Sequence, residues 1–237
     1  MRTFLIIALV ASSIGLTSCT SQQISQTIGE VLGQGLTAEE VSAGLKEALS
    51  KGATKGAQIA SKTNGYYKNA KIRIPIPPEM EEVERTLRQV GLGDEVDNFI
   101  ITLNRGAEEA AKKAAPIFVD AIKSMTIKDA WGILKGDDNA ATAYLVRTTS
   151  PKLKVEFRPV IEDALKKVNA TKYYSDIVNT YNRIPGVTKI NPDLTDYATE
   201  KAIEGLFVLV AEEEANIREN PAARTSELLR RVFSQAQ

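Results

Sequence analysis

The segment 202–211 constrains the fold more than any other part of the chain. It belongs to a predicted helix over residues 196–219 and is apolar on nearly every side of that helix. A helix with an apolar circumference must be surrounded by other parts of the protein. We therefore expect further helices to enclose this one, with Leu206 and Phe207 in the core.

Start and stop signals delimit the other helices. Thr37–Glu40 and Thr126–Asp129 are capping boxes, in which a hydroxyl and a carboxylate satisfy free N–H groups at a helix N-terminus. Ser150-Pro151 is read as an N-cap followed by proline, and Thr171 as another N-cap. The expected helices cover residues 37–62, 79–90, 94–115 with a kink or new start at Pro116, 127–136, 138–148, 150–168, 171–181, 196–219 and 221–233.

One short segment breaks the helical pattern. Residues 71–78 alternate polar and apolar side chains and then become rich in proline. This pattern predicts an extended or polyproline conformation, or one short edge strand. No linker divides the remaining sequence. The chain is therefore expected to be all-α, with a single multi-helix domain of about eight or nine helices over residues 37–237.

The N-terminus indicates export. Arg2 is followed by the uncharged stretch Phe4–Leu16, and the small residue Ser18 precedes the only cysteine, Cys19. This is the layout of a cleaved signal peptide. Leu16–Cys19 also resembles the lipobox of bacterial lipoproteins, in which the cysteine receives a diacylglycerol and becomes the new N-terminus. An ordinary signal peptide with an incidental cysteine is the alternative.

We therefore expect residues 1–18 to be a lipoprotein signal peptide and Cys19 to begin a lipidated tether over residues 19–36. The apolar stretch is shorter than the about 20 residues that a transmembrane helix needs, so acyl chains would hold the protein at the membrane. Thr20 stands where, in the enteric-type lipoproteins that this N-terminus resembles, an aspartate signals retention in the inner membrane. This favours the periplasmic leaflet of the outer membrane.

Two features of the composition narrow the chemistry. The chain has no histidine and a single cysteine. Sites that depend on histidine are excluded, and, with Cys19 acylated, so are thiol catalysis, disulfide bonds and cysteine-bound zinc. Its 30 basic and 30 acidic residues cancel, so nucleic acid is not expected as a partner. No cofactor or metal is predicted, whereas carboxylate acid–base chemistry remains possible.

The acidic run 212–214, with Arg218 one turn later, is the first candidate site. Three consecutive residues spread over about 200° of a helix surface, so at least one of these acids is expected to face inward. The candidate partners are Arg105, Arg147, Arg158 and Arg218. The group is either a general acid, with Glu212 or Glu213 as the reactive residue, or an ion pair that holds helices in register.

Two further polar groups are candidates. Asp137 and Asp138 are adjacent acids without the distal glutamate of a calcium loop, so helix capping explains them better than metal binding. Asn104 and Arg105 interrupt an apolar helix face. They form either a polar pocket shared with Arg147 or an interhelical hydrogen-bond network, and the network is favoured.

Several short segments together resemble a known family. They are Gly44–Leu49, Ile74–Pro77, Phe99–Arg105, Pro116–Ile122, Ile133–Ala141, Phe157–Pro159, Thr195–Tyr197, Gly205–Phe207 and Glu212–Arg224. In this order they resemble the bacterial DUF4197 family, over nearly all of residues 37–235. The resemblance implies an exported, often lipid-anchored bacterial protein built from helices. It carries over no activity, substrate or catalytic residue.

Two functions follow from these observations. The first is a non-enzymatic, lipid-anchored module of the cell envelope that binds a partner protein, an envelope glycan or a small apolar ligand. The second is a carboxylate-dependent enzyme that acts on an envelope polymer. A cleft in which Glu212 or Glu213 meets arginines would favour the enzyme. A sealed ion pair with an apolar groove elsewhere would favour the binding module.

Overall fold

The computed structural model describes residues 37–183, 185–186, 188–224 and 226–234. Within these ranges the chain forms α-helices and two short 3₁₀ helices and contains no β-strand, so the all-α fold class is confirmed. Thr37–Gln237 is one compact unit. No helix in the described residues is long and apolar enough to cross a membrane. The predicted signal peptide, Cys19 and the tether lie outside the described residues.

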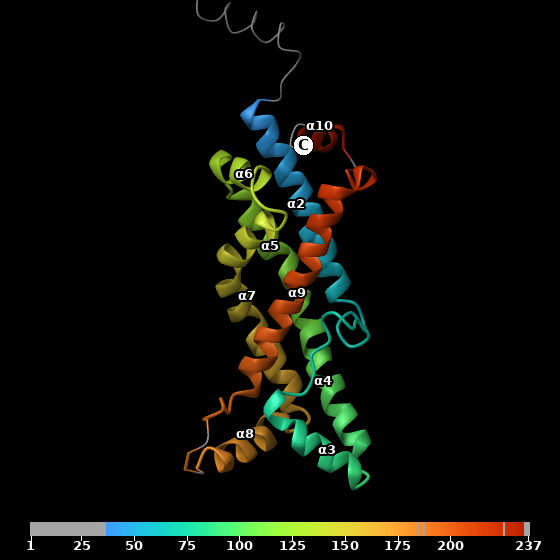
Figure 1. Ribbon diagram of the computed structural model, residues 1–237, viewed down its shortest axis with the longest axis vertical. Coiled ribbons are helices and arrows are strands. Elements are labelled where there is room, and N and C mark those ends of the chain that lie inside the picture. Colours follow the sequence, from blue (N-terminus) through green and yellow to red (C-terminus); the bar gives the residue numbers. More distant parts are fainter. Residues whose placement is uncertain (1–36, 184, 187, 225, 235–237) are drawn as a thin grey trace, which may run out of the picture. The chain divides into compact units, whose positions relative to one another are not determined.

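Figure 1 shows the arrangement of the helices. The 3₁₀ helices are Pro78–Met80 and Pro221–Ala223. The α-helices are α2 Ala38–Ala60, α3 Glu81–Gln89, α4 Gly93–Ala111, α5 Ala114–Lys123, α6 Ile127–Leu134, α7 Ala140–Lys166, α8 Ala170–Tyr181, α9 Leu194–Glu219 and α10 Glu227–Ser234.

Helix α9 is the centre of the unit. It packs along α2 and α7 and also contacts α4 and α8. Its apolar residues are buried along most of its length, and the ring of Phe207 packs against Phe118 of α5 with 5.7 Å between the ring centroids. Neighbouring helices therefore cover most of the apolar surface of α9, and one side of the helix, with Glu204 and Val208, remains exposed.

Small residues let α2 approach α9 closely. A Cβ atom on Gly56 would lie 3.3 Å from the backbone nitrogen of Val210, and one on Gly52 would lie 3.3 Å from the side chain of Ile217. Larger side chains at these positions would push the helices apart. Residue numbers rise along α2 as they fall along α9, so the two helices are antiparallel.

The segment between α2 and the first 3₁₀ helix is irregular, and the edge strand considered from the sequence is not formed. Side chains hold this segment instead of a strand partner. The hydroxyl of buried Tyr66 donates to the carbonyl of Ala202 at 2.5 Å. The Asn104 amide accepts from the N–H of Ile74 at 2.9 Å and donates to its carbonyl at 2.8 Å.

Helix α7 is continuous where the sequence predicted two helices. Pro151 lies inside it, and Ser150 is not an N-cap. Proline lacks the N–H that an interior helical residue donates. The hydroxyls of Thr148, Thr149 and Ser150 donate to carbonyl oxygens four residues earlier, at 2.8, 2.6 and 2.6 Å. These bonds fit a helical backbone on the N-terminal side of Pro151.

A buried stripe accounts for this continuity. Every fourth residue along it is buried, namely Leu145, Thr149, Leu153, Phe157, Ile161 and Leu165. Residues four apart share one face of a helix, so a break at Pro151 would divide the stripe. Burying each large apolar side chain contributes about 1.5–3 kcal/mol, and an interior proline costs about 3 kcal/mol relative to alanine. The packing therefore outweighs the penalty of the proline.

Two predicted N-caps are also wrong. Asn139 occupies the N-cap position of α7 without a side-chain hydrogen bond, and Asp137 and Asp138 are exposed. Thr171 lies inside α8, where Asn169 takes the N-cap position in a left-handed conformation with φ of 55°. At α7 the N-terminal N–H groups are instead bound by Glu214, which is distant in the sequence.

The two predicted capping boxes are present. The Thr37 hydroxyl accepts from the N–H of Glu40, and the Glu40 carboxylate accepts from the N–H of Thr37. Thr126 and Asp129 form the same reciprocal pair. The two helix starts that depend on a bond between the N-cap residue and the residue three positions later were therefore correctly predicted.

The proline inside α7 gives a stability prediction. Pro151→Ala restores the missing N–H and removes a residue that costs about 3 kcal/mol in a helix interior. Proline also lowers the conformational entropy of the unfolded chain, and losing this effect reduces the gain in stability by about 0.4–1 kcal/mol. We expect the free energy of unfolding, measured by urea titration, to rise by about 2 kcal/mol. Destabilisation would instead support a helix that begins at Ser150.

Candidate functional site

Glu214 is the inward-facing acid of the run 212–214, and its side chain is 4% exposed. One carboxylate oxygen accepts from the Ala141 N–H at 3.0 Å and from the Arg218 guanidinium at 2.9 Å. The other accepts from the N–H and the hydroxyl of Thr142, at 2.8 and 2.7 Å. Glu214 therefore caps the N-terminus of α7, where the helix dipole favours a negative charge.

The ion pair of Glu214 with Arg218 is sealed. Arg218 also donates to the carbonyl of Ile133 at 3.0 Å. The cavity beside the pair has a volume of about 10 Å³, whereas a single water needs about 10–15 Å³. No substrate fits there, so the pair joins α6, α7 and α9 as a structural contact.

Glu212 and Glu213 lie beside lysines rather than arginines. Glu212 forms an ion pair with Lys71, and Glu213 forms one with Lys55 at 2.8 Å. Both lysines are exposed, and ion pairs of this kind contribute about 0–1 kcal/mol. The structure therefore does not bring these two acids to the arginines that the enzyme hypothesis required.

Asn104 and Arg105 hold the irregular segment against α4. Asn104 bonds to the backbone of Ile74, as described above. Arg105 forms an ion pair with Glu108 and donates to the Asn64 side chain at 2.8 Å. These contacts form a hydrogen-bond network, although it joins a helix to an irregular segment rather than two helices.

Arg147 is remote from this network. Gly106, next to Arg105, packs against Ile161 of α7. Arg147 precedes Ile161 by fourteen residues in the same helix, which corresponds to about 20 Å. Its guanidinium lies 5.4 Å from the ring centre of Tyr144. The shared pocket considered from the sequence is not formed.

Asp137 and Asp138 lie exposed in the connection between α6 and α7. Across the described residues, no three side chains of the metal-binding types are grouped closely enough to hold an ion. These two aspartates therefore do not cap a helix, and they lack the neighbouring ligands that a metal site would need.

Sequence reasoning missed the buried acid Glu108. One of its oxygens accepts from the N–H groups of Tyr66 and Tyr67, both at 3.2 Å, and the other binds Arg105. The available signal was its spacing of four residues from Asn104, which places both on one face of α4. Like Glu214, Glu108 has its oxygens occupied by groups of the protein.

The structure reveals a different candidate site. A polar pocket of about 280 Å³ opens between α7, α8 and the start of α9. Arg158 and Glu162 enter it from α7, and Thr171 and Ser175 from α8. Its third wall consists of Pro192, Asp193, Leu194 and Thr195. We call this site the α7–α9 pocket. Its wall carries charged and hydroxyl side chains, so it is not the apolar groove that would have favoured the binding module.

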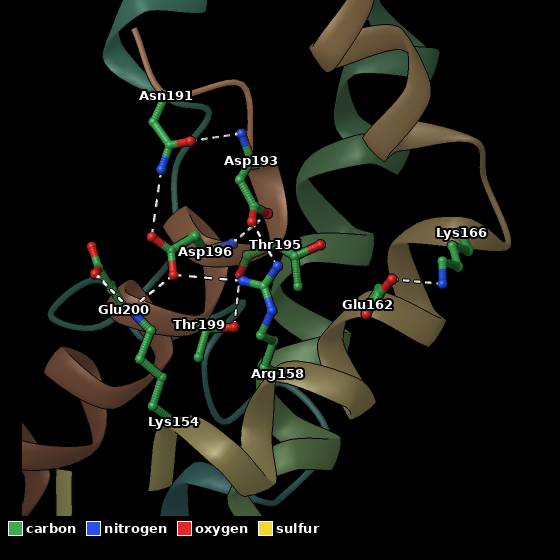
Figure 2. Close-up of polar contacts among 10 residues, drawn as sticks. All are labelled: Lys154, Arg158, Glu162, Lys166, Asn191, Asp193, Thr195, Asp196, Thr199 and Glu200. Atoms are coloured by element: carbon green, nitrogen blue, oxygen red, sulfur yellow. Dashed lines mark hydrogen bonds and ion pairs between the residues drawn. The ribbon is translucent and has the colours of Figure 1, made fainter. Parts of the chain in front are cut away.

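A charge network surrounds the α7–α9 pocket (Figure 2). The Arg158 guanidinium lies 2.6 Å from the Asp193 carboxylate and 3.5 Å from that of Asp196. The other ion pairs are Lys154–Asp196 at 2.8 Å, Lys154–Glu200 at 3.2 Å and Lys166–Glu162 at 2.6 Å. Each charged group in the pocket wall therefore already has a partner of opposite sign.

The central pair stays ionised at neutral pH. Partial burial alone would raise the pKa of Asp193, but Arg158 and the backbone N–H of Asp196 together bring that pKa below its ordinary value. The hydrogen bond to Asp193 raises the pKa of Arg158. Asp193 is also the N-cap of α9, accepting from the Asp196 N–H at 3.0 Å. The pair thus fixes the start of α9 against α7.

Thr195 presents an unpaired hydroxyl to the α7–α9 pocket. The residue is 3% exposed, and its carbonyl accepts from the Thr199 hydroxyl at 2.6 Å. Its own hydroxyl bonds to no described residue. Since no fully buried polar side-chain atom in the described chain lacks a partner, this oxygen keeps some exposure, and Thr195 is one of the residues that line the pocket. Figure 2 shows Thr195 between Asp193 and Glu162.

The family model described as "Protein of unknown function (DUF4197)" matches residues 35–234. The chain belongs to the DUF4197 family. The resemblance inferred from the sequence is therefore confirmed, and the match includes every described helix. No curated protein and no solved structure matches the chain.

The buried pair of this DUF4197 protein gives a ranked prediction. Glu214→Ala leaves Arg218 and the N–H groups of Ala141 and Thr142 without their acceptor. We expect it to lower the free energy of unfolding by about 3–5 kcal/mol. Arg218→Ala leaves Glu214 with its bonds to α7, so its cost should be smaller, about 1–3 kcal/mol.

The matched control is Glu213→Ala, which removes an ion pair between the half-buried Glu213 and the exposed Lys55, one residue away, and should cost about 0–1 kcal/mol. Urea unfolding of the three variants gives the comparison. Equal losses for Glu214→Ala and Glu213→Ala would contradict the capping role of Glu214.

Proposed function

We propose that this protein is a lipid-anchored binding module of the bacterial cell envelope, held in the periplasmic leaflet of the outer membrane by acyl chains on Cys19. The lipobox-like segment Leu16–Cys19 supports the anchor. The α7–α9 pocket is the observation that carries the binding role, because it offers charged groups and an unpaired hydroxyl to a ligand from solvent.

The position of the pocket supports this role. Gly56 of α2 lies against Val210 of α9, and the two helices are antiparallel. Thr37, the first described residue, is nineteen residues before Gly56, and Leu194 is sixteen residues before Val210. At 1.5 Å per residue, the pocket lies on the order of 50 Å from Thr37. A bound ligand is therefore held at the end of the unit opposite the residue that follows the tether.

The polar contacts favour binding over a carboxylate-dependent enzyme. Glu108 and Glu214 are occupied by backbone N–H groups and arginines. Glu212 and Glu213 are paired with lysines. A general acid must reach the substrate through a hydrogen bond, and none of these four carboxylates lines the α7–α9 pocket. The two carboxylates that do line it, Glu162 and Asp193, are held in ion pairs with Lys166 and Arg158, both at 2.6 Å.

The anchor is tested by labelling cells with a fatty acid. Cys19→Ala should abolish labelling and either release the protein from membranes or block its processing, whereas Ser18→Ala keeps a small residue and should be labelled normally. Density-gradient fractionation should place the native protein with outer-membrane markers. Labelling of the Cys19→Ala variant, or recovery with inner-membrane markers, would contradict the proposed anchoring or location.

The binding role is tested by photocrosslinking in intact cells. A benzophenone amino acid at Ser175, in the α7–α9 pocket, should give an adduct of defined mass with an envelope component. The same amino acid at Asp138, an exposed position outside the pocket, is the control and should give none. Identical adducts from both positions, or no adduct from Ser175, would contradict the proposal.

A further inference from the structure

The charges of the α7–α9 pocket disfavour a charged ligand. Arg158 is paired with Asp193, and Glu162 is paired with Lys166. An anionic ligand would compete with Asp193 for Arg158, and a cationic ligand would compete with Lys166 for Glu162. A neutral ligand can bind without breaking either pair. The charged groups can still bond to it, because a guanidinium has five N–H donors and a carboxylate about four lone-pair sites.

Three hydroxyls in the pocket wall complement those charged groups. The Thr195 hydroxyl is open to the pocket, and that of Thr171 bonds to no described residue. The Ser175 hydroxyl accepts from Asn179 at 3.0 Å, so its own hydrogen remains available to donate. Each hydroxyl can donate and accept. The best match is a ligand whose groups also do both, and hydroxyl groups have this property.

The apolar part of the wall and the size of the pocket limit the ligand further. Pro192 is exposed and offers carbon surface beside the polar groups, whereas Leu194 is buried. A volume of about 280 Å³ lies just below the range of about 300–1,000 Å³ for sites that hold drug-sized ligands. One ring with hydroxyls on its edge and C–H groups on its faces meets both conditions.

From these features we infer that the α7–α9 pocket binds a single neutral sugar ring. This inference rests on the binding function proposed above and names the ligand class of the same site. A free monosaccharide and the end of an envelope polysaccharide present the same ring chemistry. Thr195, Thr171 and Ser175 bond to the ring hydroxyls, while Arg158 and Glu162 bond to them from α7.

Saturation-transfer NMR on the full chain, purified in a detergent without a sugar headgroup, tests this inference. The neutral probes are glucose, N-acetylglucosamine and an N-acetylglucosamine trisaccharide. The charged probes are glucuronate and glucosamine. We expect transfer to the neutral probes and several-fold less to the charged ones. Tighter binding of the trisaccharide would identify a polymer end as the ligand, and equal binding would identify a free sugar.

Pocket variants locate the binding. Thr195→Val keeps the side-chain shape and removes the hydroxyl, so it should weaken binding about fivefold, the effect of one lost hydrogen bond. Ser175→Ala should act in the same direction from α8 with little effect on folding. Thr149→Val is the matched control, because Thr149 is a buried α7 threonine whose hydroxyl bonds to Leu145 outside the pocket wall.

Specific outcomes would overturn the inference. Preference for glucuronate or glucosamine would contradict the neutral ligand class, while a crosslink from Ser175 would leave the binding function standing. Neutral-sugar binding that is unchanged in both Thr195→Val and Ser175→Ala would contradict the site. Absence of binding to every probe, together with absence of the Ser175 crosslink, would contradict both the sugar and the binding module.

Discussion

The apolar circumference of α9 is the constraint on which the rest of the structure depends. A helix of this kind is stable in water only when neighbours cover it. Helices α2 and α7 cover most of α9, and Gly56 lets the α2 backbone approach Val210. The buried stripe of α7 explains in the same way why that helix continues through Pro151. For α7 and α9, burial therefore outweighs local helix propensity.

The two ends of α9 use similar groups for different purposes. Near its C-terminus, Glu214 and Arg218 lie beside a cavity of about 10 Å³ and hold α7 in place. At its N-terminus, Asp193 and Arg158 form a comparable pair at the edge of a pocket of about 280 Å³. Access from solvent distinguishes the two sites. Only the N-terminal pair has the space beside it that ligand binding requires, and the proposed function is placed there for that reason.

Local patterns predicted much of the fold but little of the α7–α9 pocket. Capping boxes and apolar periodicity depend on residues a few positions apart, so the helix starts at Thr37 and Thr126 were correct. The N-cap of α7 was wrong because Glu214 supplies it from more than seventy residues away. The pocket could not be predicted because α7, α8 and α9 meet only in the folded chain. Of its wall, only Arg158 was considered as a candidate site residue, as a partner for a different acid, and Thr171 was considered only as an N-cap.

Native-state hydrogen exchange tests the central role of α9 most directly. If burial of α9 organises the unit, its amides between Ile203 and Glu214 should exchange only through global unfolding. Amides of α3, which has no buried residue, should exchange through local opening at a lower free energy. Exchange of the central α9 amides by local opening, as easily as those of α3, would contradict the account.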